Sequence, residues 1–175
     1  MSQKEVLRRE PRVSNLHDRI KAELPDEDPV VVDLILWLAR LSRLVEQVDN
    51  RVRSDVGDLD ASESAVLASL LFAGPPYQTS PSRLSQTIIQ TTGGMAKTLR
   101  RLEQKRLIAR KPTPEDGRAL HVVLTPKGQR LIRKTLAAMV STWTQILTSD
   151  DAPTRDALLD SVLTLVSMLD SPSET

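Results

Sequence analysis

Thirteen lysine and arginine side chains between residues 75 and 134 are the most distinctive chemical groups of this 175-residue chain. The same stretch holds three acidic residues, Glu103, Glu115 and Asp116, so its formal charge is +10. The whole chain carries +1, which leaves −9 for the remainder. Guanidinium and ammonium groups bind phosphate oxygens. Charge segregated in this way is typical of a protein that binds nucleic acid.

The side chains that enzymes need for catalysis are scarce. The chain has no cysteine, which excludes disulfides, thiolate metal sites and a Cys–His dyad. Its two histidines, His17 and His121, are accompanied by no nucleophile motif, and no cluster of histidines or carboxylates has metal-ligand spacing. We therefore expect no enzyme activity, no cofactor and no metal ion.

The basic residues lie mainly in residues 80–128, whose pattern predicts a helix, a tight turn, a second helix and two short strands. Ser80 followed by Pro81 is typical of a helix start. After a turn near residues 89–90, Thr91 or Thr92 is expected to cap the second helix. This is the order of a winged helix-turn-helix, which places its second helix in the major groove of DNA.

That second helix is expected to have a core face and a DNA face. The core face, with the i, i+4, i+7 spacing of a buried stripe, consists of Met95, Leu99 and Leu102. The opposite, exposed face is expected to consist of Gly94, Lys97, Thr98, Arg101 and Lys105. The pair Gly93-Gly94 lacks the spacing of a phosphate-binding P-loop. We interpret it as allowing close approach to DNA, and relief of crowding at the turn is the alternative.

Two apolar runs separated by prolines predict a β-hairpin. The first run is 107–110, the second is 120–124, and residues 111–119 form the loop between them. Within this loop, Arg118 could enter a narrow minor groove while Asp116 holds its guanidinium group. A solvated loop with an incidental ion pair is the alternative.

Long amphipathic helices are expected on both sides of this region. In residues 30–53 the apolar residues follow spacings of three and four, which indicates packing against another long helix. Asp60 and Glu63 form a capping-box pattern, and Thr125 precedes a helix that extends to about residue 147. A last helix follows residues 150–153. These helices have more apolar surface than a small winged domain needs, which indicates a dimer built from both chain ends.

We therefore expect a mainly α fold with a small β-wing, a winged helix-turn-helix with N- and C-terminal dimerisation helices. The expected parts are an N-terminal extension and linker (1–29), a dimerisation helix (30–56), the DNA-binding domain (57–128), and C-terminal dimerisation helices with a tail (129–175). The charged N-terminal segment lacks the core of a signal peptide, and no apolar stretch is long enough for a bilayer. A soluble, cytoplasmic protein is expected.

Residues 30–169 resemble the MarR (multiple antibiotic resistance regulator) family of transcription factors. The resemblance is most specific in LSQTIIQTTGGMAKTLRRLEQKRLIARK, in the wing sequence PEDGRA and in VVLTPKG. The residues that match the family pattern are Leu84, Thr91, Thr92, Arg101, Leu102, Glu103, Leu107, Ile108, Arg110, Asp116, Arg118, Leu124, Thr125 and Gly128. The chain departs from the family at Arg106, where glycine is usual, and at Ala96-Lys97, where a Thr-Arg pair is common.

The resemblance implies a homodimer whose recognition helices enter successive major grooves of a pseudo-palindromic operator, with the wings in the flanking minor grooves. It also implies that a small ligand binds between the dimer base and the DNA-binding domain and releases the DNA. We therefore predict a ligand-responsive repressor, released by a small aromatic acid or its acyl-CoA thioester. The alternative is a winged-helix module that binds protein, or a non-specific architectural DNA-binding module without a ligand.

The predicted partners are double-stranded operator DNA, a second copy of the chain and the small-molecule effector, with no membrane. The predicted DNA-binding residues are Ser82, Thr91, Thr92, Gly93, Gly94, Lys97, Thr98, Arg101, Lys111, Asp116 and Arg118. The predicted ligand-binding residues are Trp37, Arg40, Leu41 and Leu44 on the first long helix, with Leu67 and Leu71 facing it.

Overall fold

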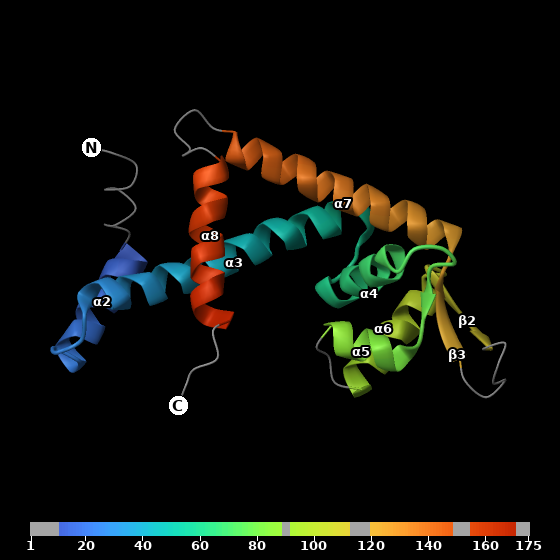
Figure 1. Cartoon of the computed structure of the whole chain (residues 1–175), viewed down its shortest axis with the longest axis horizontal. Helices are drawn as coiled ribbons and strands as arrows, with labels where there is room; N and C mark the ends of the chain where they lie inside the picture. Colours follow the sequence, from blue (N-terminus) through green and yellow to red (C-terminus); the bar gives the residue numbers. More distant parts are fainter. Residues whose placement is uncertain (1–10, 89–91, 113–119, 149–154, 171–175) are drawn as a thin grey trace. The chain divides into compact units, whose positions relative to one another are not determined.

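The computed structural model describes residues 11–88, 92–112, 120–148 and 155–170 (Figure 1). The chain divides into two compact units, Met1–Arg51 and Val52–Thr175. Among the described residues, no helix is long and apolar enough to cross a membrane.

The first unit contains α2 (Pro11–Glu23) and most of α3 (Pro29–Gly57). The structure confirms the long helix predicted from residue 30, which extends past residue 53, and it adds a helix, α2, within the segment 1–29 that was described as an extension and linker. The start of α3 has a physical cause. The Asp28 carboxylate accepts a hydrogen bond of 2.8 Å from the amide of Val30, and Pro29 occupies the first helical position, where no amide hydrogen is needed.

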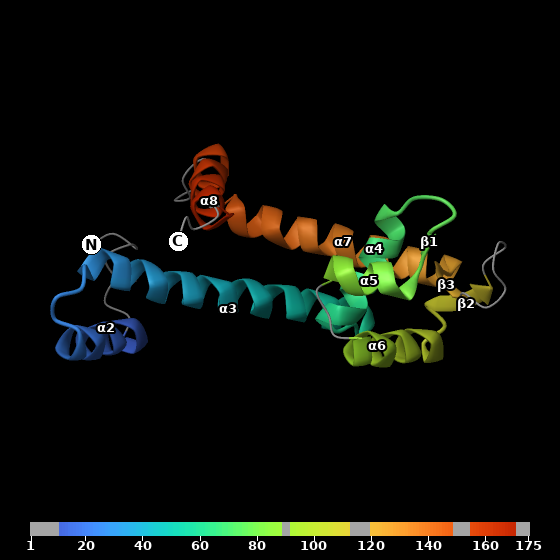
Figure 2. The same ribbon diagram turned by 60° about the horizontal axis from the view of Figure 1, so that its bottom comes forward.

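The second unit contains the predicted winged helix-turn-helix. Its helices α4 (Ala61–Phe72), α5 (Pro81–Ile88) and α6 (Thr92–Gln104) lie against a small sheet (Figure 2). The helix α7 (Pro126–Leu147) follows the sheet, and α8 (Arg155–Asp170) is the last described element. The predicted fold class, mainly helical with a β-wing, is confirmed.

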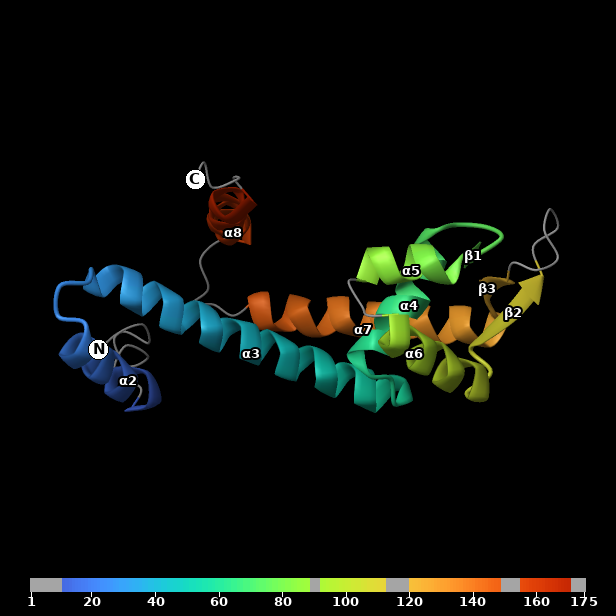
Figure 3. The same cartoon turned by 90° about the horizontal axis from the view of Figure 1, so that it is seen from below.

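The sheet has three antiparallel strands in the order β1-β3-β2. The predicted hairpin is confirmed as β2 (Ile108–Pro112) and β3 (Leu120–Leu124), which project together from the end where α7 begins (Figure 3). The third strand, β1 (Gln78–Thr79), pairs with Val122 and Val123 of β3 and was not predicted. Two residues are too few to show the alternating pattern by which a strand is recognised.

The core of the second unit is almost entirely aliphatic. The predicted buried stripe of α6 is confirmed, because Met95, Leu99 and Leu102 are at most 2% exposed. Other fully buried side chains come from every surrounding element: Val66, Leu67, Leu70, Leu84, Leu107, Val122 and Ile132. The recognition helix is therefore held by contacts with α4, α5 and β2.

The helix starts follow the sequence signals closely. Asp60 and Glu63 form the predicted capping box, in which the Glu63 amide donates to the Asp60 carboxylate (2.7 Å) and the Asp60 amide donates to the Glu63 carboxylate (3.1 Å). At the start of α7, the amide of Gly128 donates to the hydroxyl of Thr125 at 3.0 Å. Local capping chemistry therefore fixes where both helices begin.

The end of α6 is fixed by an unusual residue. Arg106 has a φ of +59°, in the left-handed region, and stands where the family usually has glycine. Its amide donates to the carbonyl of Glu103 (2.8 Å), and the amide of Leu107 donates to that of Leu102 (2.9 Å), the two hydrogen bonds of a Schellman cap. A residue with a Cβ in this conformation costs about 1 kcal/mol. Arg106 adopts this conformation despite the cost, and the resulting turn directs β2 away from the helix axis.

Gly128 gives a direct test of packing at the base of the wing. A Cβ at this position would overlap the carbonyl oxygen of Leu107, which accepts hydrogen bonds from the amide (3.1 Å) and the hydroxyl (3.0 Å) of Thr125. Because that oxygen belongs to the backbone, we expect Gly128→Ala to lower the free energy of unfolding by about 1–3 kcal/mol, measured by urea denaturation. Gly93→Ala is the matched control, since no described atom lies within 4 Å of the added carbon. Wild-type stability of the Gly128 variant would contradict this packing.

Candidate nucleic-acid interface

The recognition helix α6 has one open face. Gly93, Lys97, Arg100 and Gln104 are exposed and recur at the three- and four-residue spacing of a single helix side. Met95, Leu99 and Leu102 point into the core on the other side. The open face therefore combines a small residue at its start with two cations and an amide, a composition suited to base edges and phosphates.

Thr98 does not belong to the open face. Its side chain is 3% exposed, and its hydroxyl donates to the carbonyl of Gly94 at 3.1 Å. The prediction that Thr98 is exposed was therefore wrong. Thr98 lies three residues after Met95 and four before Leu102, so it shares their side of the helix. The buried stripe is wider than the three leucine and methionine positions from which it was inferred.

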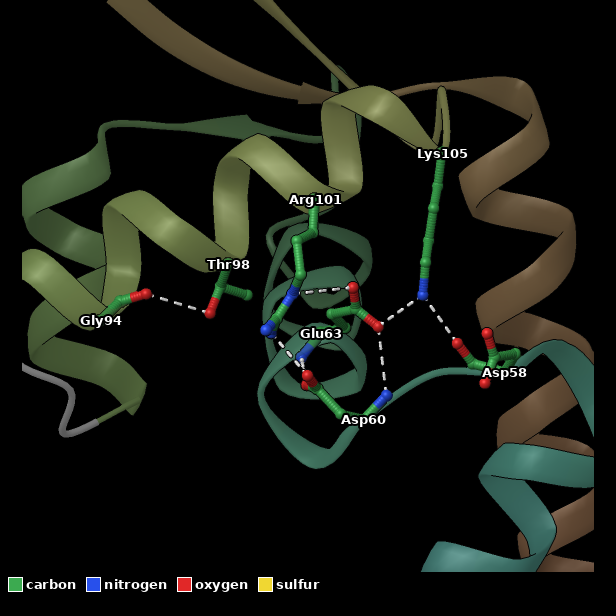
Figure 4. A network of polar contacts seen from close by, with 7 residues as sticks. All are labelled: Asp58, Asp60, Glu63, Gly94, Thr98, Arg101 and Lys105. Carbon is green, nitrogen blue, oxygen red and sulfur yellow. Dashed lines mark hydrogen bonds and ion pairs between the residues drawn. The ribbon is translucent and has the colours of Figure 1, made fainter.

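Arg101 and Lys105 form a third side of α6, directed at the start of α4 (Figure 4). The Arg101 guanidinium binds the carboxylate of Asp60. The Lys105 ammonium donates to the carboxylate of Glu63 at 2.9 Å and to the carbonyl of Asp58 at 2.7 Å. The prediction that both cations lie on the open face was therefore wrong, because their charges are engaged by acids of another helix.

Glu63 is the centre of these contacts. Its side chain is 2% exposed, whereas those of Arg101 and Lys105 are 37% and 34% exposed. Arg101 Nε lies 3.3 Å from Glu63 Oε1, within ion-pair distance but without the alignment of a hydrogen bond. A carboxylate taken out of water is costly unless cations and donors surround it. We therefore attribute the inward orientation of the two basic side chains to the buried charge of Glu63.

The remaining predicted DNA-binding residues fall into three groups. Ser82, in the first turn of α5, and Lys111, on β2, are both exposed. Gly93 and Gly94 lie in the first turn of α6, which begins at Thr92. Three predicted residues lie outside the described residues: Thr91, Asp116 and Arg118.

Arg100 was missed by the sequence reasoning. It is exposed and lies three residues after Lys97, on the same open face. The signal was present, because a helix that buries Leu99 and Leu102 turns position 100 outward. A second basic residue near this face, Arg110 of β2, lies 3.2 Å from the carboxylate of Glu103, and both side chains are about one-third exposed.

Known proteins are similar to the winged domain and to most of the chain. Residues 60–128 match the model of a winged helix DNA-binding domain. The HTH-type transcriptional regulator PecS of Dickeya dadantii (strain 3937) is 31% identical over 135 residues, which cover 77% of this chain and 81% of PecS. The structure of Sco3205, a MarR family transcriptional regulator from Streptomyces coelicolor in complex with DNA, is similar with a TM-score of 0.62 at 20% identity, over 82% of this chain and 90% of that one. The chain belongs to the MarR family.

A further structural match to this MarR-family chain is BpsR of Bordetella bronchiseptica, whose DNA binding is regulated by 6-hydroxynicotinic acid. Its TM-score is 0.58 at 20% identity, over 76% of this chain and 93% of BpsR. The family and the fold are those of DNA-binding transcriptional regulators rather than enzymes. The predictions of family, fold class and DNA-binding regulation are therefore confirmed.

The predicted ligand residues of the MarR-family chain lie in both units. Leu67 and Leu71 belong to the hydrophobic core of the second unit, where they are 0% and 9% exposed. Trp37, Arg40, Leu41 and Leu44 lie on the part of α3 in the first unit. Within that unit, Trp37 lines a cavity of about 550 Å³ together with residues of α2, among them His17, whose Nδ1 lies 2.9 Å from the carboxylate of Asp33.

Proposed function

We propose that this MarR-family regulator is a repressor that binds a pseudo-palindromic operator as a homodimer, and that a small aromatic acid or its acyl-CoA thioester releases it. The observation that carries the DNA-binding part is the open face of α6, formed by Gly93, Lys97, Arg100 and Gln104. The other sides of this helix are occupied by the core and by the contacts with α4. The open face is therefore the side of α6 that can enter a major groove.

The proposed DNA contacts are of different chemical kinds. Lys97 and Arg100 are placed to meet base edges or phosphates in the major groove. Ser82 and Lys111, exposed on α5 and β2, suit the phosphates on either side. We propose that Arg118, supported by Asp116, reaches the minor groove from the wing. We propose that Thr91 and the first turn of α6 complete the set of DNA contacts, with helix amides binding a phosphate.

The homodimer is proposed because many apolar side chains are uncovered in the single chain. The helix α8 has no buried residue, and its exposed apolar side chains are Leu159, Val162, Leu163, Val166, Met168 and Leu169. On α3, Leu34, Ile35, Leu41 and Leu44 are 44–61% exposed. Apolar surface of this extent marks an interface. We propose that residues 30–56 and 129–175 supply it, as their sequence pattern indicates.

Two observations support the proposed effector. BpsR, which shares this fold, is regulated by an aromatic acid. In this chain, Trp37 and Arg40 are one turn apart on α3 and offer an aromatic surface and a cation for a carboxylate or phosphate. We propose that Leu41 and Leu44, which are exposed on the same helix, supply the apolar part of the site. For the ligand to release DNA, it must bind a DNA-incompetent state more tightly than the DNA-bound one.

A thermal-shift screen of aromatic acids and their CoA thioesters tests the effector. A ligand that binds the folded chain raises its apparent melting temperature. Each hit is then added to the complex between the chain and a DNA sequence that the chain has selected from a random pool. We expect stabilisation and release to occur together, and transcription from a promoter that carries this sequence to rise. Hits that stabilise the chain but leave both DNA binding and transcription unchanged would contradict a ligand-responsive repressor.

Gly93 tests the close approach of α6 to DNA. No described atom lies within 4 Å of an added Cβ, and glycine is a poor helix residue. We expect Gly93→Ala to raise the free energy of unfolding by about 0.5 kcal/mol and at the same time to weaken binding of the selected DNA severalfold. Thermal denaturation and fluorescence anisotropy measure the two effects. Full DNA affinity in the alanine variant would contradict the close approach, and lower stability together with full affinity would support the alternative, in which the glycine only relieves crowding at the turn.

A further inference from the structure

The start of α4 and the end of α6 are joined by a polar network that the DNA contacts do not use (Figure 4). Its acceptor side consists of the backbone carbonyl of Asp58 and the carboxylate of Asp60, in the short connection that follows α3, together with the carboxylate of Glu63 in the first turn of α4. Its basic side is Arg101 and Lys105 of α6. The partners are 41 to 47 residues apart in sequence, so the network is a tertiary link rather than local helix chemistry.

Glu63 is bound from three directions. Oε2 accepts from the amide of Asp60 at 3.1 Å and from Lys105 Nζ at 2.9 Å, and Oε1 lies 3.3 Å from Arg101 Nε. Because Glu63 is part of the capping box, contacts at the start of α4 fix the position of its carboxylate independently of α6. Arg101 and Lys105 are one helical turn apart, so they hold α6 at two successive turns.

This arrangement restricts two movements of α6. A slide by one residue would move both cations by about 1.5 Å along the axis. A rotation by one residue would turn them by about 100° away from Glu63. Lys97 and Arg100 would move with the helix in either case. Together with the core contacts of α6, the network therefore restricts the position of the helix along its axis and its rotation, and with them the direction in which Lys97 and Arg100 face outward.

We propose that Glu63 is a positioning residue for DNA recognition, which sets the placement of α6 through Arg101 and Lys105. This inference rests on the proposed binding of a specific operator. Contacts with bases require a defined helix position, whereas attraction to phosphates depends mainly on charge. Loss of Glu63 therefore reduces discrimination between DNA sequences more than it reduces DNA binding itself.

The test compares Glu63→Gln with Glu103→Gln in the full-length chain. Both substitutions remove one carboxylate that is paired with a cation of the winged domain, and both raise the net charge by one. Affinities are measured by fluorescence anisotropy for the DNA sequence selected by the wild-type chain and for a scrambled duplex of equal length, at several salt concentrations. We expect Glu63→Gln to lower the ratio of the two affinities at least tenfold without reducing the salt dependence on scrambled DNA. Glu103→Gln should change the ratio less than twofold.

Arg101→Gln provides a second variant should Glu63→Gln unfold, since Arg101 is partly exposed. We expect it to lower the same ratio and to leave the salt slope unchanged, and the double variant to lose no more than the worse single one. A folded Glu63 or Arg101 variant with the wild-type ratio would overturn the inference. A salt slope reduced by about one in Arg101→Gln would also overturn it, because Arg101 would then be a phosphate contact. A wild-type chain that does not distinguish the two duplexes would instead contradict operator binding itself.

Discussion

Arg100→Ala is expected to weaken operator binding by ten- to a hundredfold, about 1.4–2.8 kcal/mol, and to leave stability unchanged. Arg100 is exposed on the open face of α6, beside Lys97 and opposite the buried side chains of Leu99 and Leu102. Its guanidinium can donate two parallel hydrogen bonds to a guanine, which a lysine cannot do. We therefore expect Arg100→Lys to restore little of the lost affinity.

Arg130→Ala is the matched control for charge. Arg130 is exposed on α7, and its loss changes the net charge by the same amount. Affinity for the selected DNA should then fall less than threefold. Two results would contradict base contact by Arg100: equal losses in the two alanine variants, or full recovery with lysine. Full recovery with lysine would assign Arg100 to a phosphate, and the salt slope of the alanine variant would then fall by about one.

Val162→Asp is expected to convert the proposed dimer to a monomer and to weaken operator binding more than a hundredfold. Val162 is 53% exposed in the single chain, so the substitution leaves the fold of one protomer intact. A carboxylate buried in an apolar interface costs several kcal/mol, and a two-fold interface contains the substitution twice. Light scattering gives the oligomeric state, and circular dichroism confirms that the helical content is preserved.

Thr164→Asp is the control on the same helix. Thr164 is exposed, and its hydroxyl donates to the carbonyl of Asp160 at 2.8 Å, on the polar side of α8. We expect this variant to remain a dimer with nearly wild-type operator affinity. A dimeric Val162 variant, or dissociation of both variants alike, would contradict the assignment of the apolar side of α8 to the interface.

Elements that depend on neighbours in sequence could be predicted. The capping box of Asp60 and Glu63 and the cap of Thr125 are local chemistry, so helix starts followed from residue type and spacing. The hairpin followed from two β-type runs separated by prolines. The buried side of α6 followed from periodicity at Met95, Leu99 and Leu102.

Features that depend on distant partners could not be predicted in this way. Glu63 was recognised as a capping residue, but its pairing with Lys105 joins positions 42 apart. Arg100 and Arg101 are adjacent and chemically identical. Only tertiary packing determines that Arg100 is exposed, whereas the guanidinium group of Arg101 binds the carboxylate of Asp60. Periodicity gave the centre of the buried stripe but not its width, which includes Thr98.

The same contacts revise the charge that was counted from the sequence. Residues 75–134 carry +10, but the carboxylates of Asp60 and Glu63, which precede this range, pair with its cations, so 10 − 2 = +8 describes the charge left to attract DNA better. The attraction to DNA therefore depends on fewer cations than the count suggested. Lys97, Arg100 and Lys111 therefore each supply a larger share of the attraction to DNA.

Selection of DNA from a random pool by the wild-type chain, followed by titration of the enriched duplex, tests the central claim most directly. We predict an inverted repeat with half-sites about 10 base pairs apart, bound by two chains per duplex, with an affinity that falls steeply as salt rises. Scrambled DNA should bind at least a thousandfold more weakly, a typical ratio for specific recognition. The absence of an enriched sequence, or equal affinity for the enriched and scrambled duplexes, would contradict the account.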